Sequence, residues 1–209
     1  MVAHVGQCLV HRSEIMQLRG QWGAALREAR RVKTRFAQSM NISAAGHALY
    51  RQGEVHRLQG RFDQAESAYR QAARSGYEPQ PGLALLRLAQ GKTTAAVSTI
   101  RRALAETTDS ARRARLLPAC VEIFIANGNL EQAREACGEL EKSAKGRKSS
   151  LLDALAAESH GALELAQGKP DAALESLRHA YEGWRQLEAP YEAARVRVLI
   201  AQACRLLKD

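Results

Sequence analysis

The chain has 209 residues, of which 45% are apolar, 25% charged and 5% aromatic, as is ordinary for a soluble globular protein. No apolar run reaches about 18 residues, which excludes a membrane span, and the first residues lack the apolar core of a signal peptide. The net charge is +9, but Arg alternates with Glu and Asp, and no basic cluster interleaves with aromatic residues as a base-stacking surface would. Four widely spaced cysteines favour a reducing compartment, so we expect a cytoplasmic protein.

The first two predicted units are helical hairpins. The first covers about 5–18 and 21–36, because apolar residues recur there at helical spacing. Asn41 or Ser43 is the predicted N-cap of the next helix. The second hairpin is centred on the stretch 47–72, and Gly76 ends it after Ser75.

The later units follow the same plan. Asp109 or Ser110 is the predicted cap of the fourth unit, and Ser149 or Ser150 that of the fifth. The basic, small-residue stretch 142–150 is predicted to be a mobile loop. Remaining helices are expected at about 81–90, 110–126, 129–143, 151–166, 170–187 and 191–207.

A fixed register relates the units. Each turn contains a glycine, namely Gly20, Gly60, Gly91, Gly128 and Gly168. The fifth residue after each glycine is alanine: Ala25, Ala65, Ala96, Ala133 and Ala173. Apolar residues also stand twelve positions after each glycine and two before it. The glycines are spaced 40, 31, 37 and 40 residues apart, and a period of about 34–40 residues indicates stacked helical hairpins.

This register resembles the tetratricopeptide repeat (TPR) in a degenerate form. Trp22 and Phe62 match the aromatic residue after the turn glycine, Gly53 and Gly161 the small residue of the first helix, and Tyr69 the aromatic residue of the second. The resemblance covers about residues 7–208. It implies an all-α, right-handed superhelix of about five antiparallel hairpins plus a C-terminal helix, forming a single domain over 1–209.

A narrower resemblance is to the helical-repeat region of LuxR-type bacterial transcriptional regulators. It rests on segments such as RARLLPACVEIFIANGNLEQAREAC and LEAPYEAARVRVLIAQACRLLKD. The resemblance implies that the chain is a fragment of a longer regulator and acts as a non-enzymatic sensor or protein-interaction module. Neither a DNA-binding helix-turn-helix nor an ATPase module is recognised in the sequence.

Catalytic and metal-binding patterns are not found. Gly91-Lys92-Thr93 resembles the end of a phosphate loop, but the preceding segment is predicted to be helix rather than strand. His160 has no second ligand at metal spacing in the sequence. We therefore expect no catalytic residues, no metal site and no cofactor.

The predicted binding surface is the concave side, which the first helices line in stacked hairpins. Helical periodicity places polar and aromatic side chains there, a combination suited to a partner protein, a peptide or a small effector. A merely solvated face remains the alternative for each residue. The candidates are His47, Tyr50, Glu54, Arg57, Glu14, Gln17, Arg115 and Glu122.

The C-terminal helix carries an unusually wide apolar arc, which predicts a homodimer through this helix. The candidates for self-association are Val196, Leu199, Ile200 and Leu207. A second class of function, a nucleic-acid-binding helical repeat, rests on the net charge alone. Salt dependence separates it from the sensor class, because phosphate contacts weaken steeply with salt.

Overall fold

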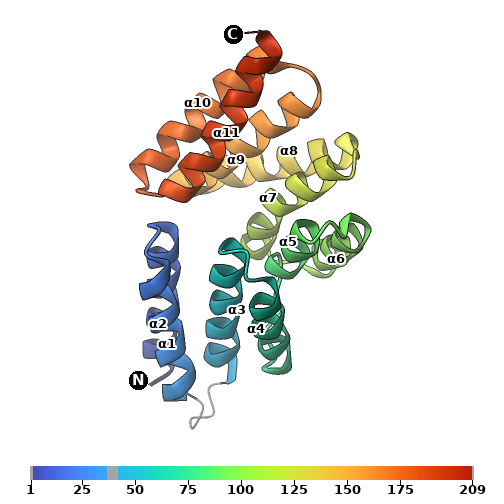
Figure 1. Cartoon of the computed structure of the whole chain (residues 1–209). Coiled ribbons are helices and arrows are strands. Elements are labelled where there is room, and N and C mark those ends of the chain that lie inside the picture. The colour runs from blue at the N-terminus through green and yellow to red at the C-terminus, as the bar shows by residue number, and fades with distance from the viewer. Residues whose placement is uncertain (1, 37–41, 209) are drawn as a thin grey trace. The chain divides into compact units, whose positions relative to one another are not determined.

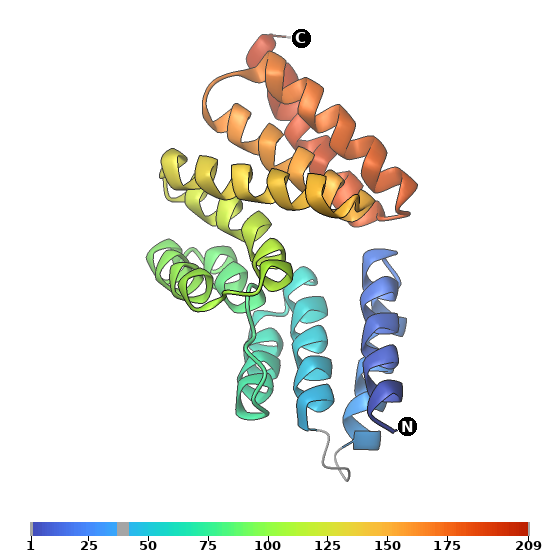
Figure 2. The same cartoon turned by 180° about the vertical axis from the view of Figure 1, so that it is seen from behind.

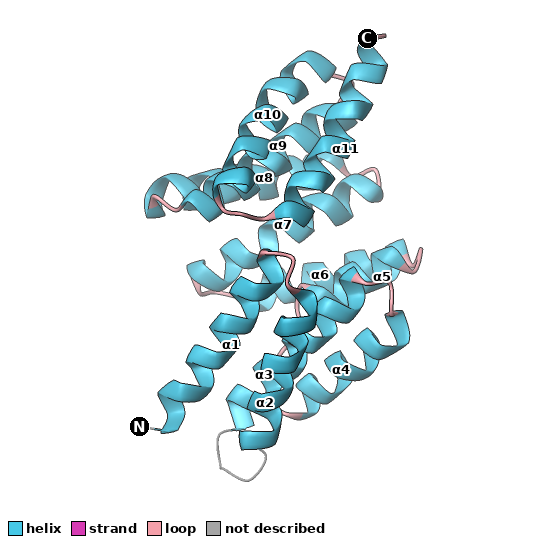
Figure 3. Ribbon diagram, turned by 60° about the vertical axis from the view of Figure 1, so that its left-hand side comes forward, coloured by secondary structure: helices cyan, strands magenta, loops and turns pink. Residues whose placement is uncertain are grey.

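The computed structural model describes residues 2–36 and 42–208 of the chain. All regular elements in these ranges are helices, α1 to α11, and strands are absent from them (Figure 3). Among these helices, none combines the length and the apolar character that crossing a bilayer requires. The prediction of an all-α, TPR-like helical repeat is confirmed.

The chain divides into two compact units, residues 1–91 and 92–209. The first contains five of the helices in Figures 1 and 2: α1 (Val2–Leu18), α2 (Trp22–Phe36), α3 (Ile42–Leu58), α4 (Phe62–Arg74) and α5 (Gly82–Ala89). The second contains the rest: α6 (Thr93–Glu106), α7 (Ser110–Ala126), α8 (Leu130–Arg147), α9 (Ser150–Ala166), α10 (Pro170–Gln186) and α11 (Pro190–Leu207). That the two units form one domain stays a prediction.

The turn glycines adopt the left-handed backbone conformation that ends a helix. All five have φ between 71° and 75°. At Gly60, for example, the next amide, of Arg61, donates to the carbonyl of His56 at 2.9 Å, which closes the last turn of α3. A residue with a Cβ is strained at such φ values, so the glycines fix where each hairpin reverses.

The alanine register marks the closest packing in both units. Each alanine five positions after a turn glycine is completely buried, and so are most of the apolar residues twelve positions after it. The residues two positions before the glycines are not part of the core, since Leu18 and Leu58 are half-buried and the others are exposed. Of the three recurring spacings in the register, only the positions five and twelve residues after each glycine therefore mark core residues.

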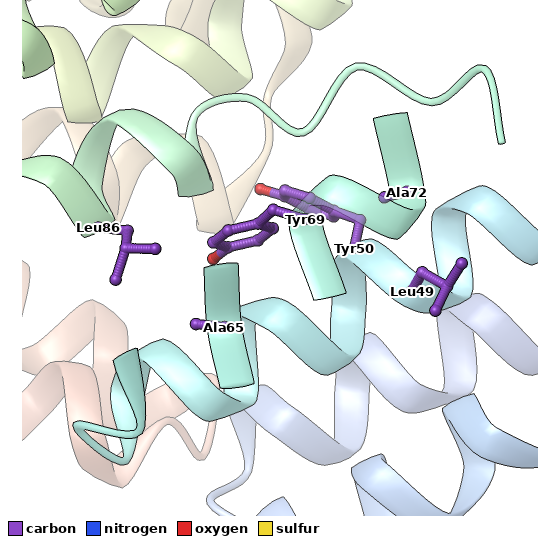
Figure 4. Close-up of a cluster of buried hydrophobic side chains, with 6 residues drawn as sticks. All are labelled: Leu49, Tyr50, Ala65, Tyr69, Ala72 and Leu86. Atoms are coloured by element: carbon purple, nitrogen blue, oxygen red, sulfur yellow. The ribbon is translucent and has the colours of Figure 1, made fainter. Parts of the chain in front are cut away.

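The core of the second hairpin joins α3, α4 and α5. Figure 4 shows Tyr50 and Tyr69 next to each other in this cluster, with ring centroids 5.8 Å apart. Gly53 lies against the ring of Tyr69, which a Cβ at Gly53 would strike. The glycine thus makes room for a tyrosine rather than for a close backbone approach.

The first helices of successive hairpins form the inner row of each unit. α1 contacts α3 and α3 contacts α5 in the first unit, and α7 contacts α9 and α9 contacts α11 in the second. Within the described part of each unit, the backbones of successive second helices do not approach one another, and α6 reaches α8 only through a side chain, where Arg101 Nε donates to Gln132 Oε1 at 3.1 Å. Hairpins that touch through their first helices and spread at their second helices curve around the first, as in other helical repeats.

Helix ends agree with the predicted caps where their side chains are described. Asp109 accepts the amide of Arg112 at 2.8 Å, and Ser149, rather than Ser150, accepts that of Leu152. The predicted cap of α3, Asn41 or Ser43, lies outside the residues whose side chains are described.

The predicted mobile loop at 142–150 is wrong over most of its length, because α8 continues to Arg147. Lys, Glu and Ala are good helix formers. Ala144 also continues the buried stripe of the helix one turn after Leu140, and both side chains are buried. Tertiary packing therefore extends a helix whose charge and small residues had suggested a loop.

Candidate functional site

The stripe on α3 predicted to face a groove is largely internal. Tyr50 is only 5% exposed and packs against the rings of Tyr69 and Tyr77, whose centroids lie 5.8 and 5.2 Å from its own. His47, half-buried one turn earlier, stacks on Tyr77 at 4.9 Å. The aromatic residues at this end of α3 therefore belong to the packing between α3 and the segment that follows α4.

A buried polar cluster continues this face of α3. The Glu54 carboxylate accepts a hydrogen bond from the Tyr69 hydroxyl and forms an ion pair with Arg57, whose Nη2 lies 3.1 Å away. Gly82, the first residue of α5, covers the carboxylate so closely that a Cβ there would strike it. Burial opposes the charge of Glu54, but Arg57, the Tyr69 hydroxyl and Arg51 together outweigh it and hold the pKa of Glu54 below its usual range. These groups satisfy one another, so Glu54 is a structural residue.

The candidates on α1 meet α3 through a residue that the sequence did not single out. Arg51 Nη2 lies 2.8 Å from Glu14 Oε1 and is nearly buried. Its guanidinium also sits over the Tyr50 ring, 5.2 Å from the centroid. Gln17 is half-buried one turn after Glu14. The stripe on α1 therefore reaches α3 through an ion pair that fixes the two first helices together.

The inner row of the second unit carries a charged network across three helices. Arg195 of α11 lies 2.9 Å from Glu122 of α7, 3.9 Å from Glu158 of α9 and 3.3 Å from Glu192 of its own helix. Arg115, two turns before Glu122 on α7, is exposed. The predicted candidates Arg115 and Glu122 thus lie on a face that α7, α9 and α11 share.

Glu158, a carboxyl of this network, has a raised pKa. Burial raises its pKa, Arg195 opposes this, and Glu192 adds to it, with the result that the pKa of Glu158 is about 7. Trp184 of α10 donates its indole N–H to Glu158 at 2.8 Å, and Glu122 is the remaining charged group nearby. The carboxyl is therefore partly protonated at neutral pH.

This shift predicts a specific pH dependence of stability. Because the folded-state pKa is raised, the favourable contribution of Glu158 is complete below the pKa of the unfolded chain and is lost as the pH rises through 7. Glu158→Gln keeps an acceptor for Trp184 but cannot ionise. From pH 4.5 to 8 the wild type is expected to lose about 3 kcal/mol more stability than the variant, at about 1.4 kcal/mol per pKa unit.

Urea midpoints at both pH values measure this difference. Glu182→Gln, an exposed glutamate of α10, is the matched control and should follow the wild type. If the urea midpoints of the wild type and of Glu158→Gln changed equally between the two pH values, the raised pKa of Glu158 would be contradicted.

The candidates for self-association on α11 divide into two groups. Val196 is completely buried inside the unit, so it is not available to a second chain. Leu199, Ile200 and Leu207 are half-buried. The large apolar side chains that α11 exposes most are Val198 and Leu206, 58% and 60% exposed. Packing against α10 covers much of the apolar arc, and self-association through α11 stays a prediction.

A group of potential metal ligands was missed at the sequence level. One ligand atom each from Cys137, Glu141 and His160 lies within 4.8 Å of the other two. Cys137 and Glu141 are one turn apart on α8, and His160 comes from α9, so only the packing of the two helices brings them together. Burial, reinforced by the nearby carboxylates of Glu141 and Glu164, raises the pKa of the Cys137 thiol to about 12.

Comparison with known families agrees with this architecture. The family described as tetratricopeptide repeat matches residues 19–79, which include α2, α3 and α4. No curated protein matches the chain. The fold is thus a TPR-like helical repeat; TPR units generally mediate protein–protein interactions and are generally not catalytic.

Proposed function

We propose that the chain is a non-enzymatic interaction module that binds a partner protein or peptide on the inner row of its second unit. The observation that carries the proposal is the Arg195 network, in which one side chain reaches carboxylates on both neighbouring first helices, Glu122 at 2.9 Å and Glu158 at 3.9 Å. Such pairing requires α7, α9 and α11 to present their polar residues to one common surface.

The residues available on this surface suit recognition of a polar peptide. Arg115 is exposed, and helical spacing places Leu151, also exposed, on the same face of α9 as Glu158. Interfaces commonly combine a charged side chain that selects the partner with apolar side chains that supply affinity. In the first unit, by contrast, Tyr50 and Glu54 are buried, so the inner face there offers fewer accessible groups.

Substitution of an exposed arginine tests the proposal. Peptides selected from a random display library against the intact chain would be measured by fluorescence anisotropy. Arg115→Glu is expected to weaken binding by about tenfold or more, equivalent to about 1.4 kcal/mol, because it reverses the charge at the contact. Arg178→Glu is the control, since Arg178 is exposed on α10, a second helix, and binding should change less than about twofold.

Equal effects of the two substitutions would contradict a binding surface on the first helices. So would peptides whose affinity is unaffected by Arg115→Glu. Circular dichroism of both variants checks that the helices are retained, which is expected because both side chains are exposed.

We also propose that this module is the repeat region of a LuxR-type transcriptional regulator and senses a partner or a small effector there. The support is the resemblance of several helical segments to that class. The reading frame around the chain tests it: a downstream helix-turn-helix is expected, and a complete gene without any DNA-binding segment would exclude it.

Homodimerisation is a further part of the proposal and would use the exposed apolar residues of α11. Light scattering coupled to size exclusion at micromolar concentration measures it directly. Val198→Glu together with Leu206→Glu should shift a dimer to a monomer, whereas a wild type that is already monomeric would exclude this interface.

Nucleic-acid binding is the alternative, and the distribution of charge favours placing it in the first unit. Lys and Arg outnumber Asp and Glu there by roughly two to one, whereas the second unit is nearly balanced. A steep fall in affinity for duplex DNA with rising salt would support this alternative. Weak binding without sequence preference is expected if the chain is an interaction module.

A further inference from the structure

We propose that Cys137, Glu141 and His160 form a binding site for a divalent transition metal ion of the Zn²⁺ class, between α8 and α9. One donor atom from each of the three side chains lies within 4.8 Å of the other two. The set contains one sulfur, one oxygen and one nitrogen donor, a combination that suits Zn²⁺ and Co²⁺ and disfavours Mg²⁺ and Ca²⁺. The site does not depend on the proposed partner surface.

The spacing of the donors is close to that of a metal site. His160 Nδ1 lies 2.8 Å from Glu141 Oε1, similar to the separation of roughly 3 Å between two ligands of one tetrahedral Zn²⁺. Cys137 precedes Glu141 by four residues, which places both side chains on one face of α8. The Cys137 sulfur must approach the other two donors slightly, and Glu141 can rotate to allow this because its side chain is about one-third exposed.

The histidine is oriented from its other side. His160 Nε2 lies 3.6 Å from Glu164 Oε1, and the second oxygen of Glu164 accepts a hydrogen bond from the Ser176 hydroxyl at 2.8 Å. Ligating histidines in proteins are usually held with one ring nitrogen on the metal and the other donating to a carboxylate. Glu164 stands on the Nε2 side of His160, so a small movement of the ring on metal binding would let Nε2–H donate to Glu164 while Nδ1 turns from Glu141 to the ion.

A fourth coordination position is available on the open side. Glu141 and His160 line a cavity of about 560 Å³ between α8, α9 and α10. The ion would reach the three ligands through this cavity, and water would complete its coordination. With three protein ligands and one exchangeable position, the site is of the open kind rather than the closed structural kind.

Titration of the intact chain with Co²⁺ tests the site. We expect thiolate-to-cobalt charge-transfer absorption that saturates at one equivalent and disappears when Zn²⁺ displaces the probe. Cys137→Ser should abolish the band. Glu164→Gln should retain it with an affinity about 10–100-fold lower, the usual effect of removing a carboxylate that orients a ligating histidine.

The other cysteines supply matched controls. Cys120 is buried on α7 and Cys8 is exposed on α1, and neither belongs to the cluster, so Cys120→Ser and Cys8→Ser should leave the titration unchanged. His160→Gln is a second test in case Cys137→Ser does not fold, because His160 is about half exposed and its replacement should not disturb the fold. Loss of this ligand should weaken Co²⁺ binding at least tenfold, since even removal of a group that only orients a ligand usually costs about 10–100-fold. No thiolate band in the wild type, a band that survives Cys137→Ser, or one that Cys8→Ser removes would overturn the proposal.

Discussion

Glu54→Ala is expected to destabilise the first unit by about 3–5 kcal/mol, because removing one member of a buried ion pair leaves the other charge without compensation. The loss strands the Arg57 guanidinium, whose side chain is only 17% exposed, and removes the acceptor of the Tyr69 hydroxyl. Both consequences act in the core that joins α3, α4 and α5.

Urea denaturation measures the effect, with an exposed pair as the control. Glu182 and Arg185 of α10 are each more than half exposed, so Glu182→Ala should change stability by less than about 1 kcal/mol. The pKa of Glu54 is depressed in the folded state, so its contribution is present above the pKa of the unfolded chain and is lost as the pH falls through the folded value. A Glu54→Ala loss no larger than that of the control would show that the cluster is not coupled as described.

Gly161→Leu is expected to cost about 3 kcal/mol or more, the upper end of the range for an overfilled core. A Cβ at this position of α9 would lie 2.6 Å from Leu177 Cγ, and the backbone of Ala173 is 3.3 Å away. Leu177 and Ala173 are both completely buried, so neither α10 residue can move aside without opening the core.

Gly138→Leu provides the matched control on α8. Its Cβ would meet nothing within 4 Å, so the substitution should raise stability by up to about 1 kcal/mol, since leucine favours a helix interior over glycine. We expect Gly161→Leu to lower the free energy of unfolding and Gly138→Leu to raise it. If both raised the urea midpoint, the close packing of α9 on α10 would be wrong.

The repeat was predictable because its turns and close contacts impose narrow chemical requirements. A left-handed turn position favours glycine and a close helix contact favours alanine, so both appear at fixed offsets in the sequence. The end of α8 was not predictable in this way. Local composition suggested a loop there, whereas burial of Ala144 depends on a neighbouring helix.

In the candidate sites too, the sequence predicted local features but not those that depend on packing between helices. Helical periodicity placed His47, Tyr50, Glu54 and Arg57 on one face of α3, but it did not show that Tyr69 and Gly82 cover part of that face. The cluster of Cys137, Glu141 and His160 joins two helices. The repeat register places α8 beside α9. A search for metal-ligating side chains four residues apart on such adjacent helices, 137 with 141 and 160 with 164, could therefore have found this cluster.

Hydrogen–deuterium exchange with a bound peptide tests most directly whether the first helices carry the binding surface. The intact chain would be compared with and without a saturating selected peptide. Slower exchange in α7, α9 and α11, with α8 and α10 unchanged, is the predicted result. Protection confined to α8 and α10 would contradict it, because those second helices lie outside the inner row.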